Sequence, residues 1–428
     1  MNVKLVFSQF LIACVAIFAS AQAWAVLHLE VTGGIDSGIL IAVPEFSAEN
    51  TVSQKLSDVI NSDLIRSGSF SPMSKDKMPV SQVAGTDVNI QDWQGNDLQN
   101  LVSGSIAKDG SNYVISFNLY DVPSGSVILS KKAKVSANNL RKYAHMISNM
   151  IYEKIVGLKG AILTKNAYVS VDYKDAYPFR LVIADYDGYN EHIILRSKEP
   201  VMSPTWSPDG SSVAYVSFEK RKPGIWIQNI QGKTRQLITS FPGINGSPKW
   251  SPKGDRLALV FSKDGNPEIY TIGLGSKSMA RLTNNRAIDT EPSWAPDGSI
   301  YFNSDRGGKP QIYRMAGGGE AQRVTWEGDA NMNPCVSPDG KYIALITQSN
   351  GSYRVARLDL DTKNLMVLSN SQFDESPSIA PNGSMIIYST IIRGRKGLAL
   401  VSADGRFHAN LPSVSGEVRA PAWSPFLN

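Results

Sequence analysis

The amino-acid sequence predicts two structural units: a small N-terminal α/β domain, then a six-bladed β-propeller closed by the C-terminal strand. Three observations predict this multidomain class, α/β followed by all-β. They are a sixfold repeat in the second half of the chain, a strand count that balances only if the two ends of the repeat meet, and mixed helix and strand patterns before the repeat. The 428 residues are enough for both units to bury hydrophobic cores.

The first 25 residues have the pattern of a secretory signal peptide. Lys4 precedes an apolar run over residues 5–19, and small residues frame a cleavage site after Ala25. Cys14, in the sequence Leu-Ile-Ala-Cys, offers the alternative of a lipid-modified N-terminus, although the apolar run continues beyond it. No other segment has the length of a membrane-spanning helix. We therefore expect an exported protein that does not span a membrane.

The N-terminal α/β domain is predicted over residues 26–160. Residues 39–43 are typical of a buried strand, and apolar residues recur at helical spacing over residues 52–64. Two apolar runs around Pro123-Ser-Gly125 predict a β-hairpin, and a long amphipathic helix is predicted from residue 138 to Gly157.

Six copies of a Pro-x-Trp-Ser-Pro-Asp-Gly motif or its close variants fill the second half of the chain. Within Pro-Asp-Gly, Pro fixes φ, Asp bonds its own backbone and Gly accepts a positive φ, so each copy specifies a tight turn. An apolar strand follows each turn, and four strands per repeat of 42 to 44 residues are typical of a propeller blade. The predicted blades start near Pro204, Pro248, Pro292, Pro334, Pro377 and Pro421.

The two ends of the repeat supply the parts of a single blade. The sixth motif provides one strand before the chain reaches Asn428, whereas residues 167–196 contain three strands that have no motif of their own. A closed ring over residues 167–428, with its last blade completed by residues 167–196, leaves no strand unpaired.

The sequence carries no recognisable catalytic, metal-binding or cofactor-binding motif. Hydrolase and nucleotide-binding glycine motifs are absent, and Ser-Gly-Ser at residues 67–69 and 103–105 is interpreted as turn material. The four histidines have no partner at the spacing of a metal site or catalytic triad: His28, His145, His192 and His408. The net charge of +5, from 43 basic and 38 acidic residues, is too small to indicate nucleic acid. We expect a protein that is not an enzyme, has no cofactor and acts through its surfaces.

Two surfaces are candidates for binding other proteins. The segments before the leading prolines connect neighbouring blades and converge at one mouth of the channel, where polar groups stand beside Met and Ile. The candidates there are Met202, Ser203, Ile244, Ser247, Thr290, Glu291, Glu375 and Arg419. The second surface follows the cleavage site and alternates like a strand. It can pair with the sheet edge of another protein or form an ordinary edge strand of the first domain. Its residues are Val26, Leu27, His28, Leu29, Glu30, Val31 and Thr32.

Together these features resemble the TolB family of the Tol-Pal system. Beyond the repeats and the closing strand, the resemblance includes Ile35-Asp-Ser-Gly38, Asp185-Tyr-Asp-Gly-Tyr-Asn190, Thr325-Trp-Glu-Gly328 and the segment from Asp374 to Gly383. The resemblance implies a periplasmic, monomeric adaptor between the outer and inner membranes.

In that family, the propeller mouth holds Pal, the peptidoglycan-associated lipoprotein, and the N-terminal segment engages TolA. The assembly supports outer-membrane integrity and invagination during cell division. The resemblance places the Pal site on the mouth candidates, foremost Ile244, Ser247, Thr290 and Glu291, and the TolA site on Val26 to Thr32. It also implies that Pal changes whether the N-terminal strand is free, and it leaves other outer-membrane proteins as further partners.

Two alternatives remain open. One is a periplasmic propeller that binds a glycan or another small ligand. The other is the propeller of a prolyl-peptidase-like hydrolase, for which residues 26–160 have neither the length nor the nucleophile of the catalytic domain.

Overall fold

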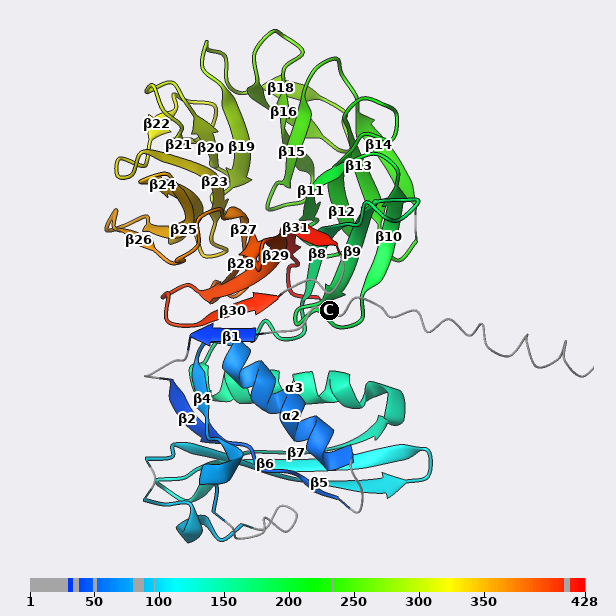
Figure 1. The fold of residues 1–428 in the computed structure, drawn as a ribbon, viewed down its shortest axis with the longest axis vertical. Helices are drawn as coiled ribbons and strands as arrows, with labels where there is room; N and C mark the ends of the chain where they lie inside the picture. Colours follow the sequence, from blue (N-terminus) through cyan, green and yellow to red (C-terminus); the bar gives the residue numbers. More distant parts are fainter. Residues whose placement is uncertain are drawn as a thin grey trace, which may run out of the picture.

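The computed structural model describes residues 30–33, 38–48, 52–79, 88–95, 97–232, 234–411 and 416–427. The chain forms an α/β domain and a six-bladed propeller, as predicted, and the two units lie against each other (Figure 1). The predicted signal peptide with Cys14, and the segment from Val26 to Leu29, lie outside the described residues. Within the described ranges, no helix combines the length and the apolar character that crossing a membrane requires.

The N-terminal domain is a mixed sheet with two helices on one face. The strands follow the order β4-β2-β5-β6-β7, and β3 also pairs with β5. Their bounds are β2 (Ile39–Ala42), β3 (Ser47–Ala48), β4 (Phe70–Pro72), β5 (Asn100–Asp109), β6 (Asn112–Asp121) and β7 (Ser126–Ser136). β2 runs parallel to β4 because helix α2 (Val52–Arg66) forms the crossover between them. Helix α3 (Leu140–Val156) ends at Gly157, which has a φ of 78°.

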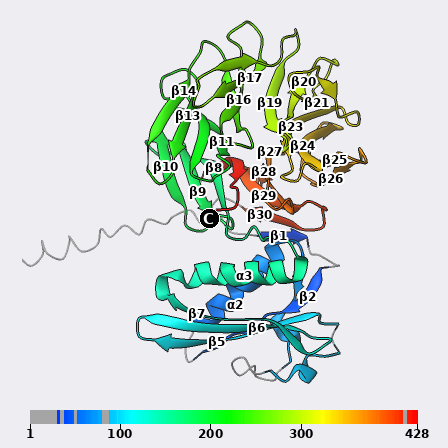
Figure 2. The same ribbon diagram turned by 180° about the vertical axis from the view of Figure 1, so that it is seen from behind.

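The two helices lie between the sheet and the propeller (Figures 1 and 2). Their apolar faces bury Ile60, Leu64, Ile147 and Ile151 against the sheet, where Phe117 is also fully buried. One helix face therefore forms the domain core, while the opposite face of the helix layer is free to meet the propeller.

The segment Ser103-Gly-Ser105 lies inside strand β5 and is not a turn, contrary to our interpretation. A Cβ on Gly104 would lie 2.3 Å from the ring of Phe46. Glycine is therefore required here because the aromatic ring packs directly on the backbone, a reason that the local sequence does not reveal.

Each propeller blade is a four-stranded antiparallel sheet. The strands, from the inner to the outer edge, are as follows: in blade 1, β11 (Val201–Trp206), β12 (Ser212–Ser217), β13 (Gly224–Asn229) and β14 (Arg235–Thr239); in blade 2, β15 (Asn245–Trp250), β16 (Arg256–Phe261), β17 (Glu268–Gly273) and β18 (Met279–Arg281); in blade 3, β19 (Asp289–Trp294), β20 (Ile300–Ser304), β21 (Gln311–Met315) and β22 (Gln322–Arg323). In blade 4 they are β23 (Ala330–Val336), β24 (Tyr342–Ser349), β25 (Ser352–Asp359) and β26 (Leu365–Val367); in blade 5, β27 (Glu375–Ile379), β28 (Met385–Ile392), β29 (Arg395–Ser402) and β30 (His408–Leu411); in blade 6, β31 (Glu417–Trp423), β8 (Lys165–Val171), β9 (Phe179–Asp185) and β10 (His192–Ser197).

The C-terminal strand closes the ring, as the strand count predicts. β31 pairs antiparallel with β8, so the first and last parts of the propeller share one sheet. The indole Nε1 of Trp423 donates a hydrogen bond of 2.7 Å to Thr164 Oγ1, and the amide of Lys165 donates one of 2.9 Å to Ser424 Oγ.

The motif tryptophans join neighbouring blades. Trp206 Nε1 donates to the Ala422 carbonyl at 2.9 Å and Trp250 Nε1 to the Thr205 carbonyl at 3.2 Å. Each bond reaches the inner strand of the preceding blade, so one side chain both fills the gap between blades and satisfies a backbone acceptor.

The N-terminal strand β1 (Glu30–Gly33) does not belong to the sheet of the first domain. It pairs antiparallel with β30, making blade 5 a five-stranded sheet. Of the two alternatives for this segment, an ordinary edge strand of the first domain is therefore wrong for residues 30–33. The outer strand of blade 5 offers unpaired backbone groups, and β1 satisfies them.

Candidate functional site

The strand order defines two faces of the propeller. Connections between blades and the hairpins between the second and third strands lie at one end of the strands, here called the mouth face. The Pro-Asp-Gly turns lie at the other end, where the side chain of Asn382 donates to the Lys159 carbonyl at 3.2 Å. The turn between β9 and β10 meets α2 and α3 at this same end. The N-terminal domain thus contacts the face opposite the mouth.

The channel is narrowed by a ring of six residues, each directly before a leading proline. All six are non-glycine residues with a φ of 48–55°, an uncommon conformation: Ser203, Ser247, Glu291, Asn333, Ser376 and Ala420. Each lies at a bulge between the first and second strands of its blade. Together with neighbouring prolines and Lys249 they line a cavity of about 100 Å³.

The carboxylate of Glu291 is hydrogen-bonded within this ring. Its Oε2 accepts a hydrogen bond of 2.8 Å from the Asn333 amide, and Asn333 Oδ1 accepts one of 3.3 Å from the Ser376 amide. Burial raises the pKa of the Glu291 carboxyl, while the bonds from Asn333 and the charge of Lys249 oppose the rise. The carboxylate therefore connects blades 3 and 4, a structural role that the sequence did not indicate.

Large apolar side chains surround the mouth, and we call this set the apolar rim. These side chains are large and apolar, yet 43–71% of each is exposed: Met202, Ile244, Ile288, Trp326, Phe373 and Ile391. They come from five successive blades or the connections before them. Several large exposed apolar side chains around one mouth are typical of a protein-binding surface.

Of the residues in the apolar rim, only Met202 and Ile244 were predicted from the sequence. A signal for two others was present, because Ile288 and Phe373 occupy the connections just before β19 and β27, equivalent to the position of Ile244 before β15. Trp326 was missed because it lies four residues before the start of β23 rather than directly before the inner strand, and Ile391 because it belongs to a hairpin.

Buried polar residues at the start of the inner strands hold the connections in place. Asn245 donates to the Phe241 carbonyl at 2.7 Å and accepts from its amide at 2.9 Å. Asp289 is fully buried and accepts from Arg306 at 2.8 Å, and Asp374 accepts the Val355 amide at 3.2 Å. The apolar rim is therefore pre-organised, which lowers the entropy lost when a partner binds.

The remaining candidates have varied surroundings. Thr290 is half-buried and accepts a bond of 3.3 Å from Asn303, and Glu375 pairs with Lys396 at 2.7 Å. Arg419 lies half-buried in β31. Of the predicted TolA segment, only residues 30–32 are described, in β1.

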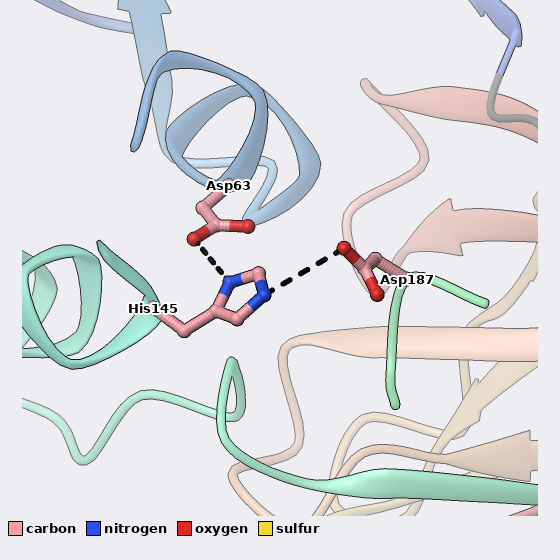
Figure 3. A group of neighbouring side chains, drawn as sticks. All are labelled: Asp63, His145 and Asp187. Carbon is pink, nitrogen blue, oxygen red and sulfur yellow. Dashed lines mark hydrogen bonds and ion pairs between the residues drawn. The ribbon is translucent and has the colours of Figure 1, made fainter. Parts of the chain in front are cut away.

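A second polar cluster lies where the two domains meet. Asp63 of α2, His145 of α3 and Asp187 of the β9–β10 turn are all buried and point toward one another (Figure 3). His145 Nδ1 lies 2.7 Å from Asp63 Oδ2, and its Nε2 lies 3.8 Å from Asp187 Oδ2. Tyr186 completes the contact by donating its hydroxyl to Asp63 Oδ1 at 2.5 Å. The segment from Asp185 to Asn190, singled out in the sequence, thus docks the propeller onto both helices.

The charges of this cluster balance without a metal ion. Arg66 lies 3.4 Å from Asp187 and 3.5 Å from Asp63, and Arg141 also pairs with Asp187. Burial alone would lower the pKa of Arg66, but Tyr186 and the two carboxylates together raise it. The guanidinium groups of Arg66 and Arg141 therefore neutralise the two carboxylates. The cluster is an interdomain joint. Histidine spacing could not reveal it, since Asp63 is 82 residues from His145.

Comparisons with known proteins agree with this architecture. Residues 27–128 match the family model described as the TolB amino-terminal domain, and residues 152–427 match the TolB beta propeller domain. The Tol-Pal system protein TolB of Hamiltonella defensa is 46% identical over 409 residues, which cover 94% of this chain and 95% of that protein. The corresponding protein of Actinobacillus succinogenes is 43% identical, with 99% of each chain covered.

A solved structure shows the same arrangement of both units. The crystal structure of TolB from Acinetobacter baumannii superposes with a TM-score of 0.86 at 39% identity, covering 94% of this chain and all of that one. The match extends over the joint and the propeller alike, and the chain therefore belongs to the TolB family of Tol-Pal system proteins.

Proposed function

We propose that the protein is a monomeric, non-enzymatic periplasmic adaptor that binds the lipoprotein Pal at the mouth face and TolA through its N-terminal segment. In this role it supports outer-membrane integrity and invagination during cell division, and other outer-membrane proteins are further partners. Family membership and the signal-like first 25 residues support the periplasmic location. The hydrolase alternative has lost its basis, because the matched N-terminal region is a TolB amino-terminal domain.

The observation that carries the Pal proposal is the apolar rim around the mouth. Its side chains stand on connections pinned by buried Asn and Asp residues, on the face that the N-terminal domain leaves open. We place Met202, Ser203, Ile244, Ser247, Thr290, Glu291, Glu375 and Arg419 at or beside this site, with the exposed Met202 and Ile244 in direct contact. Ser247 and Glu291 shape the channel below it.

The observation that supports the TolA proposal is the pairing of β1. Only three residue pairs join β1 to β30, and β1 is the outermost strand of its sheet. A short edge strand can leave at small cost and add to the sheet of another protein. While β1 is docked, the edge that pairs with β30 is occupied. Pal can regulate TolA binding through this strand only if Pal has different affinities for the docked and released states.

The test is a calorimetric titration of the mature protein with the soluble domain of Pal. We expect saturable binding that Ile244→Arg weakens at least about tenfold, because a buried charge opposes an apolar contact. The matched control is Val367→Arg. Val367 is about as exposed as Ile244 but lies on β26, the outer edge strand of blade 4. Absence of binding by the unaltered protein would refute the proposal, and saturable binding of a glycan instead would favour the remaining alternative.

A further inference from the structure

A groove on the mouth face separates blades 4 and 5. It encloses about 420 Å³ and opens beside two members of the apolar rim, Phe373 and Ile391. Residues from both blades line it, among them Met332, Ile346, Tyr353, Thr390 and Lys396.

The groove exists because these two blades have longer hairpins than the others. β24, β25, β28 and β29 each have eight residues, whereas the second and third strands of the other blades have five to seven. Both long hairpins end in two-residue turns with positive φ, Asn350-Gly351 and Arg393-Gly394. Three additional residues raise each wall by about 10 Å above blade 3, whose strands are the shortest.

One side of the groove is held rigid by the connection before β27. The amide of Tyr353 donates to the Gln372 carbonyl at 2.8 Å, and the amide of Asp374 donates to the Tyr353 carbonyl at 3.0 Å. This pairing stacks the ring of Phe373 on that of Tyr353, with centroids 6.5 Å apart and planes inclined by 22°. The exposed aromatic ring is therefore fixed before any partner arrives.

The opposite wall carries a buried hydroxyl group without a partner. Ile386 and Tyr388 pack against blade 4, and alternation along β28 places Thr390 on the same side. Thr390 is 5% exposed, and its Oγ1 has no hydrogen-bond partner. A buried hydroxyl that lacks a partner is unfavourable, so an incoming acceptor such as a peptide carbonyl would be stabilised here.

The surroundings of the groove are positively charged. Arg354 and Arg395 stand on the two hairpins. In the described part of the chain, the two carboxylates that line the groove are engaged: Asp374 is buried among hydroxyl and amide donors, and Glu375 pairs with Lys396 at 2.7 Å. An acidic group on a partner would therefore meet an excess of arginine.

We propose that the groove between blades 4 and 5 receives one large apolar side chain of the lipoprotein that binds the mouth face, with a carboxylate a few residues away in the same segment. The side chain fills the apolar part beside Phe373, a backbone carbonyl accepts the Thr390 hydroxyl proton, and the carboxylate pairs with Arg395. The inference rests on the proposed function, because the groove is continuous with the apolar rim and its occupant belongs to the same partner.

The test compares groove variants in the titration with soluble Pal. We expect Phe373→Ala to weaken binding about tenfold or more and Arg395→Glu to weaken it to a similar extent, with a reduced salt dependence. Thr390→Val, which keeps the shape but removes the hydroxyl, is expected to weaken binding about three- to tenfold. Matched controls are Val367→Ala on the outer strand of blade 4 and Lys341→Glu on its opposite face, both exposed and both expected to bind like the unaltered protein.

The outcomes separate this inference from the proposed function. If the unaltered protein fails to bind Pal, the proposed function itself is wrong. If binding is normal and Ile244→Arg abolishes it, but all three groove variants stay within about twofold of the unaltered protein, the groove assignment alone is overturned. Because Phe373 and Arg395 are exposed, these variants should retain the thermal transition of the unaltered protein. Crosslinking from a photoreactive residue at position 373 should capture a Pal segment with an apolar residue near a carboxylate, and capture of a segment without one would contradict the proposal.

Discussion

Replacing Asp187 by Ala should weaken the joint between the domains. The Asp187 side chain is fully buried and pairs with Arg66, which is 10% exposed, and with Arg141, which is 29% exposed. Removing one partner of a buried ion pair leaves a charge without compensation and costs about 3–5 kcal/mol. Arg141 can regain part of its hydration, so the lower end of that range applies. We expect a loss of about 3 kcal/mol in the free energy of unfolding of the N-terminal domain.

The assay is urea unfolding of the mature protein, combined with hydrogen exchange across α2 and α3. Asp187→Ala should lower the unfolding midpoint and increase exchange at the helix faces that meet the propeller. Asp361→Ala is the matched control, because Asp361 is exposed in the equivalent turn of blade 4, where no second domain docks. The control should change stability by less than about 0.5 kcal/mol.

A rescue experiment separates loss of the joint from general damage. Combining Asp187→Ala with Arg141→Met removes the guanidinium that has lost its carboxylate, while Arg66 keeps Asp63 at 3.5 Å. The double variant should recover part of the lost stability, because an apolar side chain tolerates burial without a partner. If Asp187→Ala costs less than about 1 kcal/mol, or if Asp361→Ala costs as much, the assigned role of the joint is refuted.

Three further predictions concern the channel, the closure and the N-terminal strand. Burial raises the pKa of Glu291 above its ordinary 4.5, so its contribution to stability is present below pH 4.5 and is lost as the pH rises through the raised value. Glu291→Gln should therefore gain stability relative to the unaltered protein as the pH rises above 4.5 in urea titrations, and a difference that does not change with pH would contradict the assignment. Trp423→Phe removes the hydrogen bond to Thr164 and should lower the free energy of unfolding by about 1 kcal/mol, whereas Trp423→Ala should lower it by about 3–5 kcal/mol, as measured by calorimetry. Equal losses for the two variants would show that the contributions of the hydrogen bond and of packing cannot be separated. Deleting residues 26–32 should abolish TolA binding in a pull-down while shifting the propeller Tm by only a few degrees, and failure of the variant to fold would mean that β1 is essential to blade 5.

The sequence predicted the propeller because each blade carries its own local turn chemistry. Pro-Asp-Gly or a close variant, Pro-Lys-Gly or Pro-Asn-Gly, marks the first turn of blades 1 to 5. The unequal ends of the repeat require a shared blade, so the closure follows from counting strands. The mouth could be located for the same reason, since the connections before the leading prolines must converge there.

The remaining features depend on contacts between distant parts of the chain. The alternating pattern around β1 shows that it can form a strand but not which edge it joins, and it joins β30, nearly 400 residues away. His145 has its carboxylate partners in another helix and another domain. The hydrogen bond from the Asn333 amide to Glu291 could not be predicted, because exposed and channel-lining carboxylates have the same local sequence and only the fold distinguishes them.

The most direct test of the mouth face as the docking surface is hydrogen exchange of the mature protein with and without saturating soluble Pal. We predict protection in the connections at residues 241–244, 284–288, 326–329 and 370–373, and unchanged exchange in the Pro-Asp-Gly turns on the opposite face. Protection confined to those turns, or to the N-terminal domain, would contradict this prediction.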